Sequence, residues 1–274
     1  MQKEQYDESK VTNNLKKIKH TILVLSGKGG VGKSTVAVNL AVSLSKKGYD
    51  VGILDIDIHG PSIPKMLGVE EKRPIESEVG IEPVLFSSKL KVMSMAFLLK
   101  DKDSPVIWRG PLKMTVIKQL IGDVNWGNLD YLIVDIPPGT GDEPLSIAQL
   151  IPDCDGAIVV TTPQDVALVS VRKSINFVKK MNIPIIGILE NMSGFTCPHC
   201  GKSVDIFKTG GGLKASKDFK VNFLGKVPID PNIVINGDSG NPFVIKNNDS
   251  NSGKSFLKIV ENIEKIVNNK EVKV

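Results

Sequence analysis

Cysteines, aromatic residues and long apolar runs are all scarce in this chain. Three cysteines among 274 residues do not make a disulfide scaffold, and we expect reduced thiols in the cytosol. No apolar run reaches the ~18 residues of a membrane-spanning helix, and residues 1–5 lack the apolar stretch of a signal peptide. With aromatic residues at 5%, the core must be aliphatic, which suits a buried parallel sheet. We therefore predict a cytoplasmic protein without a membrane partner.

The net charge of +5 gives little sign of a nucleic-acid partner. The richest basic stretch, residues 16–20, reads Lys-Lys-Ile-Lys-His, and no aromatic or arginine cluster accompanies it. A solvated surface segment explains such a run. Residues 1–19 are polar and without period, so we predict a flexible N-terminal segment or a short surface helix there. Nothing resembles an interdomain linker, and residues 20–274 are expected to form a single domain.

Apolar runs and helical patterns alternate along this domain. Strand-like runs lie at residues 21–26, 51–54, 91–96, 131–136, 156–161, 183–189 and 223–227, and helical patterns lie at 34–47, 166–181 and 255–267. Strands that alternate with helices of about 10–15 residues are typical of βαβ units. The pattern predicts a Rossmann-like α/β domain with a mostly parallel sheet flanked by helices.

A glycine-rich loop follows the first strand-like run directly. Residues 27–35 read Gly-Lys-Gly-Gly-Val-Gly-Lys-Ser-Thr, which matches the Walker A pattern of P-loop proteins. The glycines let backbone N–H groups cradle phosphate oxygens, and the next helix offers its positive N-terminus to the same anion. Lys33 should reach the β- and γ-phosphates of ATP, and the Ser34 hydroxyl should ligate Mg²⁺. The residues assigned to the nucleotide in this loop are Gly27, Lys28, Gly29, Gly30, Val31, Gly32, Lys33, Ser34 and Thr35.

A second lysine, Lys28, follows the first glycine of the loop. Since Lys33 already neutralises the phosphates of its own nucleotide, Lys28 could serve the nucleotide of a facing subunit during phosphoryl transfer. The loop resembles the deviant Walker A loop of the MinD/ParA/nitrogenase-iron-protein class. That resemblance implies an ATP-dependent homodimer whose signature lysine, here Lys28, crosses the dimer interface.

Carboxylates lie at the ends of two strand-like runs. Asp55 and Asp57 follow the run at 51–54, and Asp135 lies in the last part of the run at 131–136. Strand ends at this edge of an open α/β sheet face the ligand crevice. We expect Asp57 to orient the attacking water or to sense the γ-phosphate, and to take part with Asp135 in binding Mg²⁺. How Asp55 and Asp57 divide these roles stays open.

The loops beside these carboxylates resemble switch segments of one family. Residues 55–62 read Asp-Ile-Asp-Ile-His-Gly-Pro-Ser and resemble the first switch of the Mrp/ApbC family. Residues 135–142 read Asp-Ile-Pro-Pro-Gly-Thr-Gly-Asp and resemble its second switch, and Trp-Arg-Gly-Pro at 108–111 matches another of its blocks. The resemblance extends over about residues 20–240, and such a glycine-hinged second switch can move when the γ-phosphate is lost.

Residues after two later strand-like runs are candidates for the adenine end of the site. Asn191 follows the run at 183–189, and its amide can both donate to and accept from the N6/N7 edge of adenine. Pro228 and Asp230 follow the run at 223–227. The family resemblance implies that both segments surround the purine ring.

Cys197 and Cys200 form a Cys-Pro-His-Cys motif whose two sulfurs fit one metal. Half of a zinc ribbon, a thioredoxin-like dithiol and inert cysteines are three interpretations of the motif. An intrachain Cys₄ site is impossible, because one further cysteine remains, Cys154, which we expect in the buried core. A fourth interpretation is a site completed by dimerisation, in which two chains supply four thiolates for a [4Fe–4S] cluster or for Zn²⁺. The Mrp/ApbC resemblance implies the cluster, held by a Cys-x-x-Cys shared across the dimer.

The resemblance thus implies an ATP-binding and ATP-hydrolysing iron–sulfur cluster carrier. It would bind a labile [4Fe–4S] cluster at a homodimer interface and transfer it to apo-proteins. Hydrolysis is assigned to Lys28, Lys33 and Asp57. The alternative is a MinD/ParA-type positioning or partition ATPase, which needs no Cys-x-x-Cys. A MinD-like protein should also end in an amphipathic membrane helix, whereas residues 268–274 are polar.

Overall fold

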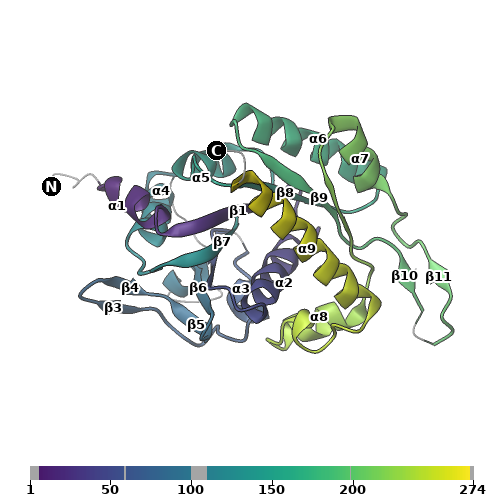
Figure 1. The fold of residues 1–274 in the computed structure, drawn as a ribbon, viewed down its shortest axis with the longest axis horizontal. Coiled ribbons are helices and arrows are strands. Elements are labelled where there is room, and N and C mark those ends of the chain that lie inside the picture. The colour runs from purple at the N-terminus through teal and green to yellow at the C-terminus, as the bar shows by residue number, and fades with distance from the viewer. Residues whose placement is uncertain (1–5, 59, 100–109, 198, 272–274) are drawn as a thin grey trace.

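The computed structural model describes residues 6–58, 60–99, 110–197 and 199–271, and an eight-stranded sheet runs through its centre (Figure 1). Its strands are β1 (Ile18–Ser26), β2 (Val51–Asp55), β5 (Val84–Ser87), β6 (Leu90–Ser94), β7 (Leu129–Asp135), β8 (Gly156–Thr161), β9 (Ile185–Glu190) and β12 (Phe223–Lys226). Their order is β12-β9-β8-β1-β7-β2-β6-β5, and neighbours are parallel except for the antiparallel edge strand β5. The prediction of a mostly parallel α/β sheet is confirmed.

Helices cover both faces of this sheet (Figure 1). They are α1 (Ser9–Leu15), α2 (Lys33–Lys46), α3 (Ile63–Met66), α4 (Gly110–Gly122), α5 (Asp142–Leu150), α6 (Asp165–Lys180), α7 (Gly211–Phe219), α8 (Pro231–Asp238) and α9 (Asn251–Glu271), with 3₁₀ turns η1 (Met95–Leu98) and η2 (Phe243–Ile245). Helix α2 packs on β1, β2 and β7 and against α9, while α6 and α7 pack on β8, β9 and β12. Strands β2 and β8 are buried along their whole length, as expected for central strands covered on both faces.

The folded part begins before the expected boundary at residue 20. Helix α1 packs on α4 with Val11 buried, and β1 already pairs with β7 at Ile18. The side chain of Asn14 donates to the carbonyls of Ile121, Gly122 and Val124 at 2.8–3.0 Å, and thereby binds carbonyls at the C-terminal end of α4. The expected boundary therefore falls inside β1, which begins at Ile18. The polar residue Asn14 of α1 has a specific partner 110 residues further along the chain, and no local pattern indicates such a partner.

Two small hairpins lie beside the main sheet and were not predicted. One joins β3 (Ile75–Ser77) to β4 (Gly80–Glu82), and the other joins β10 (Phe195–Thr196) to β11 (Ser203–Val204). The second hairpin projects from the body of the molecule at the right of Figure 1. Across the part of the chain that the structure describes, no helix is long and apolar enough to cross a membrane.

Candidate nucleotide site and cysteine hairpin

The phosphate loop connects the carboxyl end of β1 to the first turn of α2. Gly30 and Gly32 have φ angles of 77° and 80°, in the left-handed region that favours glycine. A Cβ built on Gly29 or Gly30 would meet no heavy atom within 4 Å, so the loop borders open space. Gly32 is also the N-cap of α2, whose first N–H groups have no acceptor within the helix. This open cradle of N–H groups fits the phosphates of a nucleotide.

Lys33 and Ser34 lie against the carboxylate that ends β7. The Nζ atom of Lys33 is 2.7 Å from Oδ1 of Asp135 and 3.5 Å from Oδ2 of Asp57, and Oγ of Ser34 donates to Oδ2 of Asp135 at 2.5 Å. Lys33, Asp57 and Asp135 are all buried. The residues that we assigned to the γ-phosphate and Mg²⁺ therefore come together from three strand ends. Carboxylate and hydroxyl oxygens are ligands that Mg²⁺ prefers, so this set fits Mg²⁺-ATP.

Asp55 and Asp57 occupy different environments. The fully buried carboxylate of Asp55 accepts hydrogen bonds from Oγ of Ser94 at 2.9 Å and from the backbone N–H groups of Asp57 at 3.1 Å and Ile63 at 3.4 Å. Asp55 therefore holds the loop between β2 and α3, whereas Asp57 contacts Lys33. Burial, and secondly the charge of Asp135, raise the pKa of Asp55 to about 8, against the opposing effect of Lys33. Burial also raises the pKa of Asp135, although Lys33 and Ser34 oppose that shift.

The carboxyl group of Asp55 should make the nucleotide-free protein less stable as the pH rises. Its folded-state pKa of about 8 lies above the unfolded value of 3.8, so its stabilising contribution is complete below about pH 4 and is lost as the pH rises through about 8. The substitution Asp55→Asn keeps an acceptor oxygen and removes the titration. The loss of unfolding free energy between about pH 5 and about pH 8.5 should shrink by on the order of a few kcal/mol in this variant. Urea unfolding without Mg²⁺ measures it, and equal losses in both proteins would contradict the raised pKa.

Lys28 and Asn191 flank the same loop. Lys28 is half-buried, and its carbonyl accepts from Oγ of Ser26 at 2.9 Å. No carboxylate among the described residues pairs with the ammonium of Lys28, which leaves it available to a second molecule. The amide of Asn191 is buried and donates to the carbonyl of Val31 at 2.9 Å, so Asn191 contacts the phosphate loop directly.

The segment that holds Pro228 and Asp230 runs beside Asn191. The N–H of Val227 donates to the carbonyl of Glu190 at 2.8 Å, and Pro228 is half-buried. The side chain of Asp230 caps α8 by accepting from the N–H of Asn232 at 3.0 Å. The two segments expected at the adenine end are therefore neighbours, and Asp230 has a structural role besides any contact with a base.

Cys197 and Cys200 lie in the turn of the β10–β11 hairpin (Figure 1). Cys200 is exposed and Cys197 is partly exposed, whereas Cys154 is buried, as predicted. The pKa of the Cys197 thiol is lowered because backbone N–H groups of Cys200 and, secondly, His199 donate to its sulfur. A lowered pKa favours the thiolate, which is the form that binds metals.

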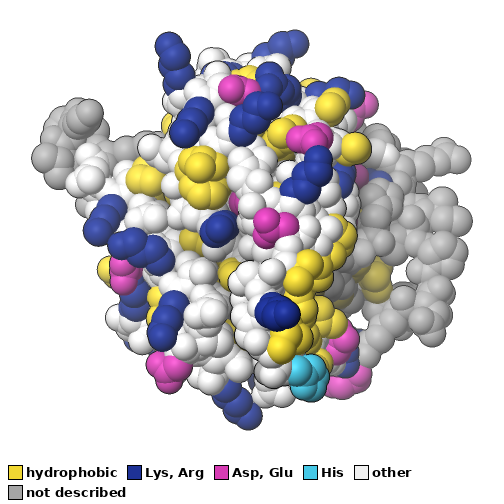
Figure 2. Space-filling model, turned by 90° about the vertical axis from the view of Figure 1, so that its right-hand side faces the viewer, with side chains coloured by type: hydrophobic (Ala, Val, Ile, Leu, Met, Phe, Trp, Pro, Cys, Tyr) yellow, Lys and Arg dark blue, Asp and Glu magenta, His cyan; other side chains and the backbone are white. Residues whose placement is uncertain are grey.

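One chain places two free thiols at this turn. No group of three or more His, Cys, Asp and Glu side chains in the described ranges is arranged to hold a metal ion. Figure 2 views the molecule from the side of the hairpin and shows hydrophobic side chains gathered on that face. Exposed apolar residues of the hairpin's second arm and the segment after it are Val204, Ile206 and Phe207. The two thiols thus lie beside an apolar, solvent-exposed surface.

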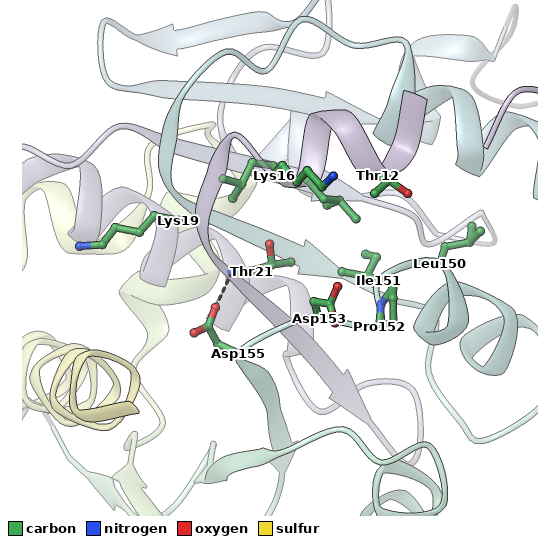
Figure 3. Close-up of a pocket in the computed structure, with 11 residues that line it drawn as sticks. Thr12, Lys16, Lys19, Thr21, Leu150, Ile151, Pro152, Asp153 and Asp155 are labelled. Atoms are coloured by element: carbon green, nitrogen blue, oxygen red, sulfur yellow. Dashed lines mark hydrogen bonds between the residues drawn. The ribbon is translucent and has the colours of Figure 1, made fainter. Parts of the chain in front are cut away.

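A separate cavity of about 210 Å³ lies at the other end of β1, between α1 and the segment that follows α5 (Figure 3). The hydrogen bond from the N–H of Thr21 to Asp155, 2.8 Å long, ties β1 to that segment. The phosphate loop follows the opposite end of this strand, so the cavity is no part of the nucleotide site. His59 of the first switch, Pro198 of the cysteine motif and the block at 108–109 lie outside the described residues.

The fold and the phosphate loop together define a P-loop NTPase. A nucleotide-binding protein from Archaeoglobus fulgidus, solved in complex with ADP, has a TM-score of 0.77 at 40% identity, over 86% of this chain and 92% of that one. The cell division ATPase MinD from Pyrococcus furiosus has a TM-score of 0.65 at 26% identity, over 90% of this chain and 99% of that one. The predicted MinD/ParA-like fold is thus confirmed.

The particular family follows from sequence comparison. Residues 17–264 match the family described as NUBPL iron-transfer P-loop NTPase. The "Iron-sulfur cluster carrier protein" of Methanocaldococcus jannaschii is 54% identical over 96% of this chain and 91% of its own length. The "Cytosolic Fe-S cluster assembly factor CFD1" of Kluyveromyces lactis is 55% identical over 81% of this chain and 80% of its own length. The chain belongs to the NUBPL iron-transfer P-loop NTPase family, and the resemblance drawn from the motifs is confirmed.

The sequence motifs did not indicate one further residue near the cysteines. Glu190, the last residue of β9, is fully buried and accepts hydrogen bonds from three donors on the segment that carries the hairpin. A carboxylate at the end of a buried strand, directly before Asn191, is the signal that could have indicated it.

Proposed function

We propose that this protein is an ATP-hydrolysing iron–sulfur cluster carrier that works as a homodimer. Two copies would hold a labile [4Fe–4S] cluster between them, each through Cys197 and Cys200, and would pass it to apo-proteins. The names of the M. jannaschii and K. lactis relatives support this role, and the word "cytosolic" in the second supports a cytosolic location.

The observation that carries the proposal is the cysteine turn itself. Two thiols, one of them with a lowered pKa, lie at an exposed turn on an apolar face, and one chain offers two of the four thiolates that a cluster takes. A second copy, facing the first, completes the set. Exposure suits cargo that must leave, since a buried cluster would be inaccessible to an acceptor.

The nucleotide site supplies the control of this assembly. Lys33 would bind the β- and γ-phosphates, and Ser34, Asp57 and Asp135 would hold Mg²⁺ directly or through water. Bound Mg²⁺-ATP supplies a γ-phosphoryl group whose transfer to water releases free energy. Asp57 would orient that water, and Lys28 would reach the nucleotide of the partner chain, so that hydrolysis depends on the dimer.

The cluster-loaded protein is expected to sediment as a dimer of twice the 29.7 kDa chain mass. Because each chain has two ligands at the turn, removal of the iron with a chelator should weaken the dimer and shift the protein toward the monomer. Analytical ultracentrifugation under anaerobic conditions, before and after chelation, measures both states. A monomer that retains four iron atoms would overturn the shared site.

 The packing of helix α9 argues against the MinD/ParA-type alternative. The membrane helix that a MinD-like positioning ATPase should carry needs a free apolar face. In α9 the apolar residues Phe256, Ile259, Val260, Ile263 and Val267 are instead buried in the core. The helix is therefore committed to packing on the sheet, and the cysteine turn has no role in a MinD/ParA-type positioning or partition ATPase.

A further inference from the structure

Glu190 ties together the two ends of the segment that carries the cysteine hairpin. One carboxylate oxygen of Glu190 accepts from the hydroxyl of Ser193, just before the hairpin, and from the N–H of Gly210 at 2.9 Å, just after it. The other oxygen accepts from the N–H of Gly212 in the first turn of α7. The chain thus leaves the body at Ser193 and returns at Gly210, and one buried carboxylate fixes both points. We call these three hydrogen bonds of Glu190 the clamp.

The geometry around this carboxylate is close-packed. A Cβ built on Gly212 would lie 3.1 Å from Cβ and from Oε2 of Glu190, which leaves little room for either residue to shift. Hydrogen bonds to an ionised acceptor are stronger than those between neutral groups, and a buried donor left without an acceptor is costly. A change at Glu190 should therefore move the two ends of the hairpin relative to each other, and with them the turn that holds Cys197 and Cys200.

Asn191, the residue after Glu190, is hydrogen-bonded to the phosphate loop. Asn191 donates from its backbone N–H to the carbonyl of Thr161 at 2.7 Å, and from its side chain to the carbonyl of Val31 in the phosphate loop at 2.9 Å. A Cβ built on Gly32 would lie 2.3 Å from Nδ2 of Asn191, so the contact leaves no space between loop and amide. A rearrangement of the phosphate loop must displace Asn191, and with it the adjacent Glu190.

The loop before α8 is joined to the hairpin in the same way. The N–H of Ser193 donates to the carbonyl of Val227 at 2.9 Å, and the N–H of Ile229 donates to the carbonyl of Gly194 at 2.8 Å. Phe195 in β10 also forms a β-bridge with Ile229. The residues that enclose Pro228 therefore pair with the first arm of the hairpin, a few residues before Cys197.

We propose that Glu190 is the positioning residue through which occupancy of the nucleotide site sets the arrangement of Cys197 and Cys200. The inference rests on the proposed function, since it assigns a regulation to the same cysteine turn. Nucleotide at the phosphate loop and Asn191 shifts the β9 end, and the carboxylate transmits that shift to both ends of the hairpin. In this arrangement Glu190 acts through Asn191 and through the two ends of the hairpin, and it is assigned no contact with the nucleotide or the metal.

The test measures the reactivity of the two thiols in metal-free, full-length protein. In a Cys154→Ser background, the rate of alkylation of Cys197 and Cys200 by iodoacetamide should change about fivefold when Mg²⁺-ATP is added. In the Glu190→Gln variant of this background, one amide NH₂ faces a backbone N–H and the clamp is lost, so the rate should change less than about twofold. The dissociation constant of ATP should stay within about threefold, because Glu190 lies outside the phosphate loop.

Asp165→Asn is the matched control. Asp165 pairs with Lys208, which lies between β11 and α7, through an exposed ion pair 2.6 Å long, and its loss should leave the fivefold response intact. Ser193→Ala removes one of the three donors and should reduce the response without abolishing it, which keeps the test open if Glu190→Gln fails to fold. A full response in Glu190→Gln or in Ser193→Ala, an equal loss in Asp165→Asn, or no response in the background protein would overturn the proposal.

This readout is independent of the cluster. A protein that takes up no iron and sulfide would contradict the proposed carrier function and would leave the thiol response to ATP as it is. Conversely, a carrier that transfers its cluster equally well with and without Glu190 would keep the proposed function and reject the clamp.

Discussion

We expect that protein carrying Cys197→Ser or Cys200→Ser will hold no stable cluster after anaerobic reconstitution with iron and sulfide. A serine hydroxyl is not a thiolate at neutral pH, so each substitution leaves two sulfur ligands in a dimer where four are needed. The bound iron and sulfide should fall at least about tenfold, since weaker changes around metal ligands already cost that much. Transfer of a cluster to an apo-protein should fail in both variants. Iron and sulfide analysis together with visible absorption measures the loss.

Cys154→Ser is the matched control for these two substitutions. Cys154 is buried, away from the turn, and the variant should bind a cluster like the unmodified protein. ATP binding should survive all three substitutions, because the phosphate loop lies on a different segment. Stable clusters in Cys197→Ser and Cys200→Ser would reject the four-thiolate site. Zinc in place of iron in anaerobically purified protein would instead assign the same thiolates to a tetrahedral zinc site.

The regular part of the fold could be predicted because its signals are local and repeated. The strand Gly156–Thr161 was predicted at its observed bounds, and helix α6 was predicted to within one residue at each end. Both are long enough for periodicity or an unbroken apolar run to distinguish them. Strands β10 and β11 have two residues each, which is too short for any such pattern, so the hairpin that carries the cysteines could not be predicted.

The start of β1 was predicted three residues late for a different reason. Residues 18–20 read Ile-Lys-His, a polar pattern, yet the strand begins at Ile18 because it pairs with Leu129 on β7. The ring of His20 packs at a tilt against the ring of Tyr131, with the ring centroids 5.0 Å apart. Its Nδ1 lies 3.2 Å from the carboxylate of Asp155. Tertiary partners thus override a local pattern that reads as surface.

The residues of the candidate site likewise differ in whether a local sequence pattern or the tertiary fold determines their role. The phosphate loop could be found from sequence because its chemistry lies in the backbone of nine consecutive residues. The division of labour between Asp55 and Asp57 could not, because it depends on Ser94, which the fold brings to Asp55 from the neighbouring strand β6. The clamp at Glu190 depends on N–H groups 20 and 22 residues further along the chain, and no motif records that distance.

Lys33→Ala is expected to abolish tight ATP binding, whereas Lys28→Ala should spare it. The ammonium of Lys33 is buried between Asp57 and Asp135, where charge–charge contacts are weakly screened. Removal of this ammonium should therefore lower the affinity of the protein for the phosphates of ATP roughly 100-fold or more. Lys28 has no carboxylate partner within the described chain and is assigned to the partner's nucleotide, so Lys28→Ala should change the dissociation constant by less than about threefold. Its rate of hydrolysis should fall about 100-fold or more, as expected for a lost transition-state cation.

The two variants control for each other, because the same residue type is removed from the same loop. Circular dichroism should show that Lys33→Ala folds, since protonation of Asp135, whose pKa burial already raises, relieves the loss of the lysine cation. Titration with a fluorescent ATP analogue and a phosphate-release assay then separate binding from hydrolysis. Mixing Lys28→Ala with hydrolysis-deficient Asp57→Asn protein should restore part of the activity, because each mixed dimer contains one site with an intact Asp57 that receives Lys28 from the other chain. Equal losses of ATP affinity in Lys28→Ala and Lys33→Ala, or no recovery on mixing, would reject a role for Lys28 across the dimer interface.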